Sequence, residues 1–204
     1  MRCYSYMSSK ALGSLLCNEK LSGRYAYADK DLRNRYEWMR HQMSHRIGPA
    51  PDAGAYPIWV WYMWEGKLKC PDARDLSYQR MEDPGGVFRV TLDIPDNLVL
   101  LSNFDTWHAI LNDSYLYVTD EEFDKENHSR EEIVKSWDRI FDISNVEWNK
   151  FFGPSVLSIQ GTVWEITVGM IVKIEHFHHI KPTEKFLENK KFWDNIDDNS
   201  RYNV

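Results

Sequence analysis

The fold is decided by the stretch Tyr56-Pro57-Ile58-Trp59-Val60-Trp61-Tyr62-Met63-Trp64. Its side chains are β-branched or aromatic almost throughout and none is charged, which is typical of a strand buried on both faces. A loop rich in proline, glycine and alanine precedes it at residues 50–55, and a long polar segment follows at residues 65–86. We therefore predict an interior strand, with Trp59 and Trp61 mostly buried, because aromatic surface is costly to leave in water.

Before this stretch, the sequence predicts a strand and two helices. Residues 3–7 alternate in size as a short strand does, and Ser8 and Ser9 are N-caps for a helix that carries Leu12, Leu15 and Leu16. Asp29 is the candidate cap of the second helix. One apolar face of this helix is predicted, because four apolar residues follow one another at spacings of four, three and four: Leu32, Tyr36, Met39 and Met43.

After the stretch, strand and helix signals are mixed. Three segments are predicted to be neighbouring strands of one sheet, with a turn at Val168-Gly169 before the last: Val87–Ile94, Val156–Ile166 and Ile171–Phe177. Residues 98–101 indicate a short buried strand. Asn103 or Asp105 can cap a helix over residues 104–111, and a capping box at residues 129–132 opens another helix.

Strands do not alternate strictly with helices, so the predicted class is α+β rather than a doubly wound fold. We expect a mixed or mostly antiparallel sheet with the helices of the N-terminal half packed on one side of it. Residues 1–180 are predicted to form a single domain in which residues 113–142 are an acidic helical insertion. Residues 181–204 are predicted to be a C-terminal tail.

Composition excludes several classes of protein. The chain has 204 residues, of which 43% are hydrophobic and 14% aromatic, so disorder and low-complexity scaffolds are excluded. No apolar run approaches the roughly 18 residues of a membrane span, and the start of the chain lacks the apolar stretch of a signal peptide. The three cysteines are odd in number and widely spaced, as in a reduced protein. These features predict a cytoplasmic protein without a membrane partner.

Charge is segregated along a chain of net charge -6. Residues 1–50 hold nine Lys and Arg against four Asp and Glu, whereas residues 113–132 hold two against eight. Two interpretations remain open. Both regions are solvated surfaces, or the basic region binds a phosphate-bearing ligand with an acidic flap beside it.

Three aromatic-rich blocks stand in a distinctive order along the chain. They read Tyr56-Pro57-Ile58-Trp59-Val60-Trp61-Tyr62-Met63-Trp64-Glu65-Gly66-Lys67, then Leu100-Leu101-Ser102-Asn103-Phe104-Asp105-Thr106-Trp107-His108, then Ser158-Ile159-Gln160-Gly161-Thr162-Val163-Trp164-Glu165. With these blocks the chain resembles an uncharacterised bacterial family, domain of unknown function 3841 (DUF3841), between Tyr4 and Phe177. That resemblance implies boundaries and no activity.

The order of the predicted elements also resembles the ADP-ribosyltransferase superfamily. It runs from a polar-aromatic strand through a helix, a buried aromatic strand and a long loop to sheet strands with a glutamate near the end. The chain departs from that pattern in two ways, since no Arg or His is clearly placed on the first strand, although Arg2 is close, and Glu165 has no Glu-x-Glu partner. The resemblance implies an NAD-consuming transferase or glycohydrolase whose acceptor, a protein, a nucleic acid or water, is unspecified.

Glu165 is the candidate catalytic residue, because cleavage of the nicotinamide–ribose bond develops positive charge that a carboxylate can stabilise. If its strand is regular, Glu165 shares a face with Val163 and Gly161, and Gly161 leaves room for a ligand. The alternative is a glutamate that ends an edge strand and faces solvent. The candidate NAD-binding residues, each of which can instead be packed in the core, are Tyr4, Ser5, Tyr62, Trp64 and Gln160.

Weaker patterns leave other options open. Asp105 and His108, three apart, are either an acid–base pair or a helix cap with a packed histidine. Basic residues of the long loop, namely Lys67, Lys69 and Arg74, either hold phosphates or form an ordinary surface. His176 and His178 share a strand face but have no third ligand at a recognised spacing, so no metal is predicted. The alternative function is a non-enzymatic binding module of a phage-defence or toxin–antitoxin system.

Overall fold

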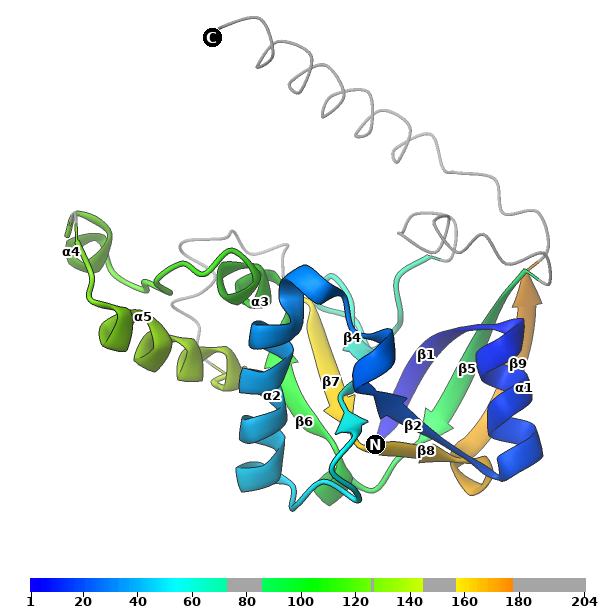
Figure 1. Ribbon diagram of the computed structural model, residues 1–204. Helices are drawn as coiled ribbons and strands as arrows, with labels where there is room; N and C mark the ends of the chain where they lie inside the picture. The colour runs from blue at the N-terminus through cyan, green and yellow to red at the C-terminus, as the bar shows by residue number, and fades with distance from the viewer. Residues whose placement is uncertain (73–85, 126, 145–156, 178–204) are drawn as a thin grey trace, which may run out of the picture.

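The computed structural model describes residues 1–72, 86–125, 127–144 and 157–177. Its main element is a six-stranded sheet in which every pairing is antiparallel (Figure 1). In spatial order the strands are β6 (Leu100–Asn103), β7 (Ile159–Val163), β4 (Ile58–Met63), β1 (Arg2–Ser8), β5 (Val87–Asp93) and β9 (Ile171–Phe177). The predicted α+β class with an antiparallel sheet is confirmed.

A second sheet of three short strands lies beside the first. Its order is β3 (Ala55–Tyr56), β2 (Lys20–Arg24) and β8 (Glu165–Thr167). Two segments that were each predicted to be one continuous strand are split between this sheet and the six-stranded sheet. Pro57 separates β3 from β4, because proline has no N–H for a strand ladder, and Trp164 separates β7 from β8.

Five α-helices complete the described part of the chain: α1 (Ser9–Asn18), α2 (Arg33–Arg46), α3 (Phe104–Leu111), α4 (Asp120–Phe123) and α5 (Arg130–Ser136). The predicted N-cap Ser8 accepts from the Ala11 N–H, and the capping box at residues 129–132 is present. Asp29 caps only a 3-10 turn, Lys30–Leu32, that precedes α2. Each cap satisfies N–H groups that the first turn of a helix leaves without partners.

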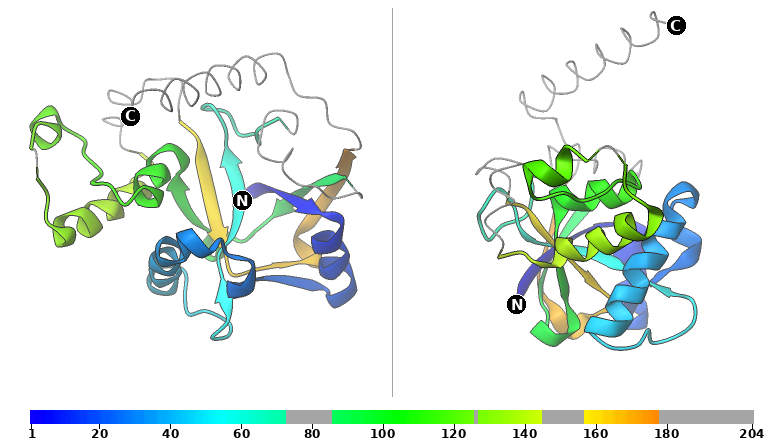
Figure 2. Two further views of the ribbon diagram at one scale, coloured as in Figure 1. Left: turned by 45° about the horizontal axis from the view of Figure 1, so that its top comes forward. Right: turned by 90° about the vertical axis from the view of Figure 1, so that its left-hand side faces the viewer.

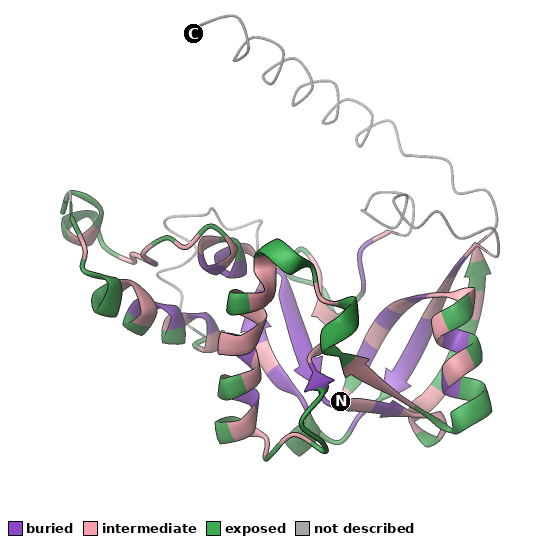
Figure 3. Cartoon of the chain, viewed as in Figure 1, coloured by how far each residue is buried: buried purple, intermediate pink, exposed green. Residues whose placement is uncertain are grey.

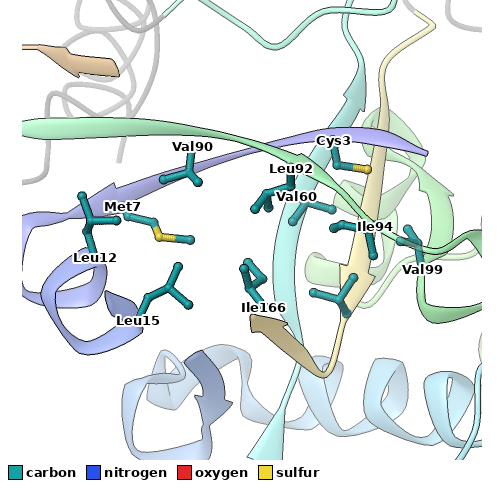
Figure 4. Close-up of a cluster of buried hydrophobic side chains, with 11 residues drawn as sticks. Cys3, Met7, Leu12, Leu15, Val60, Val90, Leu92, Ile94, Val99 and Ile166 are labelled. Carbon is teal, nitrogen blue, oxygen red and sulfur yellow. The ribbon is translucent and has the colours of Figure 1, made fainter. Parts of the chain in front are cut away.

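Two clusters of buried side chains lie on opposite faces of β4. The first cluster includes Val60 together with residues of β1, β5 and α1 (Figure 4). Trp59 packs against the second cluster, which contains Met39 and Met43 of α2. Because successive side chains of a strand point to opposite faces, α1 and α2 pack against different faces of the sheet. The prediction that the N-terminal helices share one side is therefore wrong.

The interior position of the aromatic strand is confirmed, since β4 lies between β7 and β1. Trp59 and Trp61 are half-buried rather than fully buried. Of the three segments predicted to be neighbours, all contribute strands to the six-stranded sheet, but only β5 and β9 are adjacent to each other. The predicted turn at Val168-Gly169 is a 3-10 turn that connects β8 to β9.

The acidic region at residues 113–132 extends away from the sheet and carries α4 (Figure 2). Its outer helical surface is exposed, whereas the sheet strands are largely buried (Figure 3). Leu116, Trp137 and Ile140, from the predicted insertion at residues 113–142, are nevertheless buried in the second cluster with α2. Glu122 is bound by the Arg139 guanidinium at 2.6 Å, and hydrogen bonds from Arg139 lower the pKa of Glu122 to about 2.

Gly161 is predicted to be sensitive to substitution because core side chains occupy the space beside it. A Cβ added there would lie 2.7 Å from Val99 Cγ1 and 3.1 Å from Val60 Cγ2. Gly161→Ala should therefore lower the free energy of unfolding by about 1–3 kcal/mol, the usual result of overpacking.

Gly13→Ala is the matched control, because nothing lies within 4 Å of its added methyl group. That change should stabilise α1 by up to about 1 kcal/mol. Urea titration of both variants measures the difference, and equal stabilities would contradict the prediction.

No helix among the described residues is long and apolar enough to span a membrane. The three cysteines are free thiols, Cys3 and Cys70 buried and Cys17 exposed. The predicted tail at residues 181–204 lies outside the described residues.

Candidate functional site

One face of the six-stranded sheet carries a continuous row of polar and aromatic side chains. Residues directly opposite each other in antiparallel strands present their side chains on the same face. From β6 to β9, the row consists of Ser102, Gln160, Trp61, Tyr4, Thr91 and Lys173. The next row contains Tyr6, Arg89 and Glu175. We refer to this face, which is opposite to the first core cluster, as the pocket face.

A pocket of about 580 Å³ lies over the β1–β5–β9 part of the pocket face. Its lining combines two cations, two carboxylates, two aromatic rings, a thiol and a proline: Lys69, Arg89, Asp72, Glu175, Tyr4, Phe177, Cys70 and Pro71. The Tyr6 hydroxyl donates to the Pro71 carbonyl oxygen at 2.6 Å, which fastens the segment after β4 to the sheet. The volume is within the range of small-molecule sites, and the lining is more charged than is usual for them.

Charges in the pocket are partly balanced. The Arg89 guanidinium binds the Glu175 carboxylate at 2.9 Å, and Lys173 binds the other oxygen at 2.9 Å. The hydrogen bond from Lys173, with that from Arg89, lowers the pKa of Glu175. Within the described ranges, the Lys69 ammonium lies 3.5 Å from the Glu65 carboxylate, and about half of the Lys69 side chain is exposed. Arg89 Nη1 also donates to Cys70 Sγ at 3.5 Å, so Lys69 is the cation of the pocket that is more available to an anionic ligand.

At the other end of the row, polar side chains are buried together. We call Ser102, Asp105, Ser158 and Gln160 the polar cluster. Ser102 and Gln160 lie opposite each other on β6 and β7. Asp105, on α3, accepts from the backbone N–H of Ser158, and the Phe104 N–H donates to the Ser158 carbonyl oxygen at 2.9 Å. These bonds bring the start of α3 onto the beginning of β7.

Three atoms of the polar cluster are buried without a hydrogen-bond partner among the described residues: Ser102 Oγ, Asp105 Oδ2 and Gln160 Nε2. Ser102 is 0% exposed and Gln160 5%. Buried polar groups are nearly always paired in folded proteins, because an unpaired one costs about 1–3 kcal/mol. Such groups therefore need an explanation, and a ligand that pairs with them is one.

Asp105 is the carboxylate of the polar cluster, and its pKa is shifted. Burial raises its pKa from 3.8 to about 6, against the opposing effect of nearby His108. A carboxyl group with this pKa is ionised at neutral pH and still close enough to exchange a proton, as general acid–base groups do. The helix cap is Asn103, whose side chain accepts from the Asp105 and Thr106 N–H groups, so Asp105 itself is not the cap.

Aromatic rings border the polar cluster. Trp61 lies beside Gln160 in the row, and its ring centre is 4.8 Å from that of Phe104 and 5.1 Å from that of Trp64. His108 contacts the Phe104 ring edge-on, and its Nδ1–H donates to the Phe104 carbonyl oxygen at 3.1 Å. These rings are half-buried, apart from His108, which is exposed. They offer flat surfaces to an aromatic ligand.

Glu165 lies apart from this face. It belongs to β8 of the second sheet, where it accepts from Ser22 Oγ at 2.8 Å and from Lys20 Nζ at 3.0 Å. The hydrogen bond from Ser22 is the main reason why the pKa of Glu165 is lowered. The predicted regular strand with Gly161 and Val163 is wrong, because the chain changes sheets at Trp164. The side chain does not line the pocket.

The candidate NAD-binding residues divide between the two faces. Tyr4 lines the pocket, Gln160 belongs to the polar cluster, and Trp64 contacts Trp61 beside it. Ser5 is buried between Cys3 and Met7 of the first cluster, on the opposite face. Tyr62, also half-buried, packs against that first cluster. The structure thus brings Tyr4, Trp64 and Gln160 to one face and places Ser5 and Tyr62 on the other.

Other sequence candidates have structural explanations or lie outside the described residues. His176 stacks on Phe88 with ring centres 4.0 Å apart. Arg74 and His178 are outside the described residues. Within the described ranges, no group of three or more His, Cys, Asp or Glu side chains could hold a metal ion.

Sequence reasoning missed Arg89, Glu175 and Ser102 as site residues. A signal was present for Arg89, a charge on the polar side of an alternating strand, and for Ser102, a polar residue that ends an apolar run. Neither signal shows which strands are neighbours. The registers of β5 with β9 and of β6 with β7 were needed to place these side chains on one face.

Together these features define an α+β domain with a polar and aromatic site on one face of an antiparallel sheet. The chain belongs to the family described as Domain of unknown function (DUF3841), whose model matches residues 3–131. The match covers Tyr4 and Asp105 but ends before β7, whereas the motifs in the sequence predicted a resemblance as far as Phe177. No curated protein and no solved structure matches the chain.

Proposed function

We propose that the protein binds NAD on the pocket face and cleaves the bond between nicotinamide and ribose, as an ADP-ribosyltransferase-like transferase or glycohydrolase. The observation that carries this proposal is the alignment of Tyr4, Trp61 and Gln160 on three adjacent strands. That row joins a pocket with cations to a buried cluster with an unpaired carboxylate oxygen. A dinucleotide needs both kinds of environment.

The pocket suits the nucleotide part of NAD. Lys69 and Arg89 supply donors for a diphosphate, and Tyr4 and Phe177 supply aromatic rings beside them. Cationic side chains bind phosphate oxygens through charge-assisted hydrogen bonds, which are stronger than neutral ones. Aromatic side chains stack on bases without regard to sequence. The volume of about 580 Å³ lies within the usual range for ligand sites.

The polar cluster suits the part of NAD that reacts, namely the bond between nicotinamide and ribose. When the glycosidic bond breaks, its electron pair leaves with nicotinamide and the ribose becomes cationic at C1′. Water or the acceptor nucleophile then adds to that carbon. Asp105 is ionised at neutral pH, because its pKa of about 6 is below 7, and one of its oxygens is unpaired. It takes the role of cation stabiliser that the sequence analysis assigned to Glu165.

The order of elements supports the same proposal. The chain begins with the polar-aromatic β1, continues through α1 and α2 to the buried aromatic β4, and later adds β5 to β9. This is the sequence of elements on which the resemblance to ADP-ribosyltransferases rests. The lack of an Arg or His among Tyr4, Ser5 and Tyr6 distinguishes the chain from that pattern.

The test is incubation of the purified protein with NAD, followed by chromatographic measurement of free nicotinamide. Reactions without acceptor, with protein extract and with oligonucleotides distinguish a glycohydrolase from a transferase. Nicotinamide release above that of heat-denatured protein supports the proposal. Protein that neither binds NAD nor releases nicotinamide in any of these mixtures overturns it and favours the alternative, a non-enzymatic binding module of a phage-defence or toxin–antitoxin system.

A further inference from the structure

Seven buried side-chain atoms lack a hydrogen-bond partner among the described residues; three belong to the polar cluster, and the others are Arg33 Nε, Arg35 Nε, Asp113 Oδ1 and His128 Nδ1. Thr162 Oγ1 donates to the Leu100 carbonyl oxygen, and Ser136 Oγ pairs with the Leu116 N–H and the Ile133 carbonyl oxygen. Ser102 Oγ and Gln160 Nε2, opposite each other on β6 and β7, find no such partner among the described residues. Both side chains are more than nine-tenths buried.

The hydrogen-bonding capacity of these two atoms defines the group that would satisfy them. Gln160 Nε2 can only donate, whereas Ser102 Oγ can donate and accept. A carboxamide offers an acceptor oxygen and a donor nitrogen in one plane. Its oxygen can accept from Gln160 Nε2 while its nitrogen donates to Ser102 Oγ. A carboxylate offers only acceptors, and near the unpaired Asp105 oxygen it would also meet a like charge.

The surroundings favour a carboxamide on an aromatic ring. Trp61 is the neighbour of Gln160 in the row, and it contacts both Phe104 and Trp64. Aromatic rings pack well against such surfaces in edge-to-face or offset arrangements. The cluster is therefore polar where a carboxamide would sit and apolar beside it.

We propose that Ser102 and Gln160 form a subsite that recognises the carboxamide of an aromatic ring. This assignment rests on the proposed function, in which the carboxamide belongs to the nicotinamide end of NAD. The subsite then explains why two polar side chains stay unpaired in the interior of the sheet. It also places the leaving group next to Asp105, which follows Ser102 by three residues at the start of α3.

The experiment uses four small probes with the full chain: nicotinamide, benzamide, nicotinate and benzoate. Binding is followed by calorimetry at neutral pH. Both amides are expected to bind at least tenfold more tightly than both acids, because an acid would bring a second negative charge to a cluster that already holds the Asp105 carboxylate. Ser102→Ala and Gln160→Leu should each weaken nicotinamide binding about tenfold, since each removes one hydrogen bond.

Ser5→Ala is the matched control, because Ser5 is a buried serine on the opposite face of the sheet. It should leave nicotinamide affinity unchanged. Thermal unfolding of every variant shows whether the fold is retained, and Ser102→Ala keeps the test valid if Gln160→Leu does not fold. Equal binding of acids and amides, undetectable amide binding, or unchanged affinity in both subsite variants overturns the inference.

ADP-ribose separates this inference from the proposed function, because it lacks the carboxamide. Binding of ADP-ribose without binding of nicotinamide would overturn the subsite and leave nucleotide binding by the pocket intact. Binding of nicotinamide that depends on Ser102 and Gln160, in a protein that leaves NAD uncleaved, would support the subsite and overturn the catalytic proposal.

Discussion

Asp105→Asn is expected to reduce nicotinamide release from NAD by about a hundredfold or more while leaving the affinity for NAD nearly unchanged. The cation at the ribose exists only in the transition state, so a carboxylate that stabilises it acts mainly on kcat. A hundredfold loss is the usual scale when one preorganised electrostatic contact is removed. Asparagine keeps the shape of the side chain and its bond with the Ser158 N–H. Steady-state kinetics of nicotinamide release measures kcat and KM separately.

Glu165→Gln is the control for that experiment. It is the same kind of change, but Glu165 lies on β8 and is held by Ser22 and Lys20. This partly exposed ion pair should contribute less than about 1 kcal/mol to stability, and its loss should leave nicotinamide release unchanged. The opposite pattern, with activity lost in Glu165→Gln and kept in Asp105→Asn, would return the catalytic role to Glu165 and contradict our placement of the reacting end.

Most elements of the six-stranded sheet could be predicted from sequence because their patterns are local. The uncharged run around Val60 indicated an interior strand, and β4 is central. Met39 and Met43, at helical spacing, are both fully buried on α2. The serine and glutamate of the capping box at residues 129–132 make the expected reciprocal bonds.

The three-stranded sheet could not be predicted in this way. Strand β2 consists of Lys20–Arg24 and is mostly polar, so it has no apolar alternation to detect. It is a strand because β3 and β8 pair with it, and both partners are distant in sequence. Its existence determines where Glu165 lies. The break at Trp164 was therefore hidden from any interpretation based on the segment alone.

The residues of the candidate site were predictable only in part, because strand pairing and helix packing decide which side chains share a face. Gln160 was among the candidate NAD-binding residues, and it does belong to the polar cluster. Tyr4 and Ser5 were both selected, but neighbours in a strand face opposite ways, so they could not both reach one pocket. Asp105 was predicted to be either a helix cap or half of an acid–base pair with His108. Its burial against Ser158 depends on how α3 meets β7.

The burial of Asp105 connects function with stability. A carboxylate with an unpaired oxygen in a half-buried site destabilises the folded protein whenever it is charged. The neighbouring His108 offsets only part of this effect, because the net shift of the Asp105 pKa is upward. A residue retained at such a cost in stability is typical of active sites. The variant that loses activity should therefore be the more stable protein at neutral pH.

Asp105→Asn should raise the melting temperature by an amount that depends on pH. The pKa of Asp105 is raised from 3.8 to about 6 in the folded protein, so the folded state binds the proton more tightly than the unfolded state. Wild-type stability therefore falls as pH rises between about 4 and 6, and the full penalty is present above 6. Allowing for partial exposure, the penalty is about 1–2 kcal/mol, or about 3–5 °C.

Asparagine does not titrate, so the gap in melting temperature between variant and wild type should be smallest at pH 4 and greatest at pH 7. Other carboxylates, such as Glu122 with its lowered pKa, affect both proteins equally and cancel in the difference. Melting curves from pH 4 to 8 measure the gap, and a gap independent of pH would show that Asp105 has an ordinary pKa and is not the buried carboxylate that the proposed reaction requires.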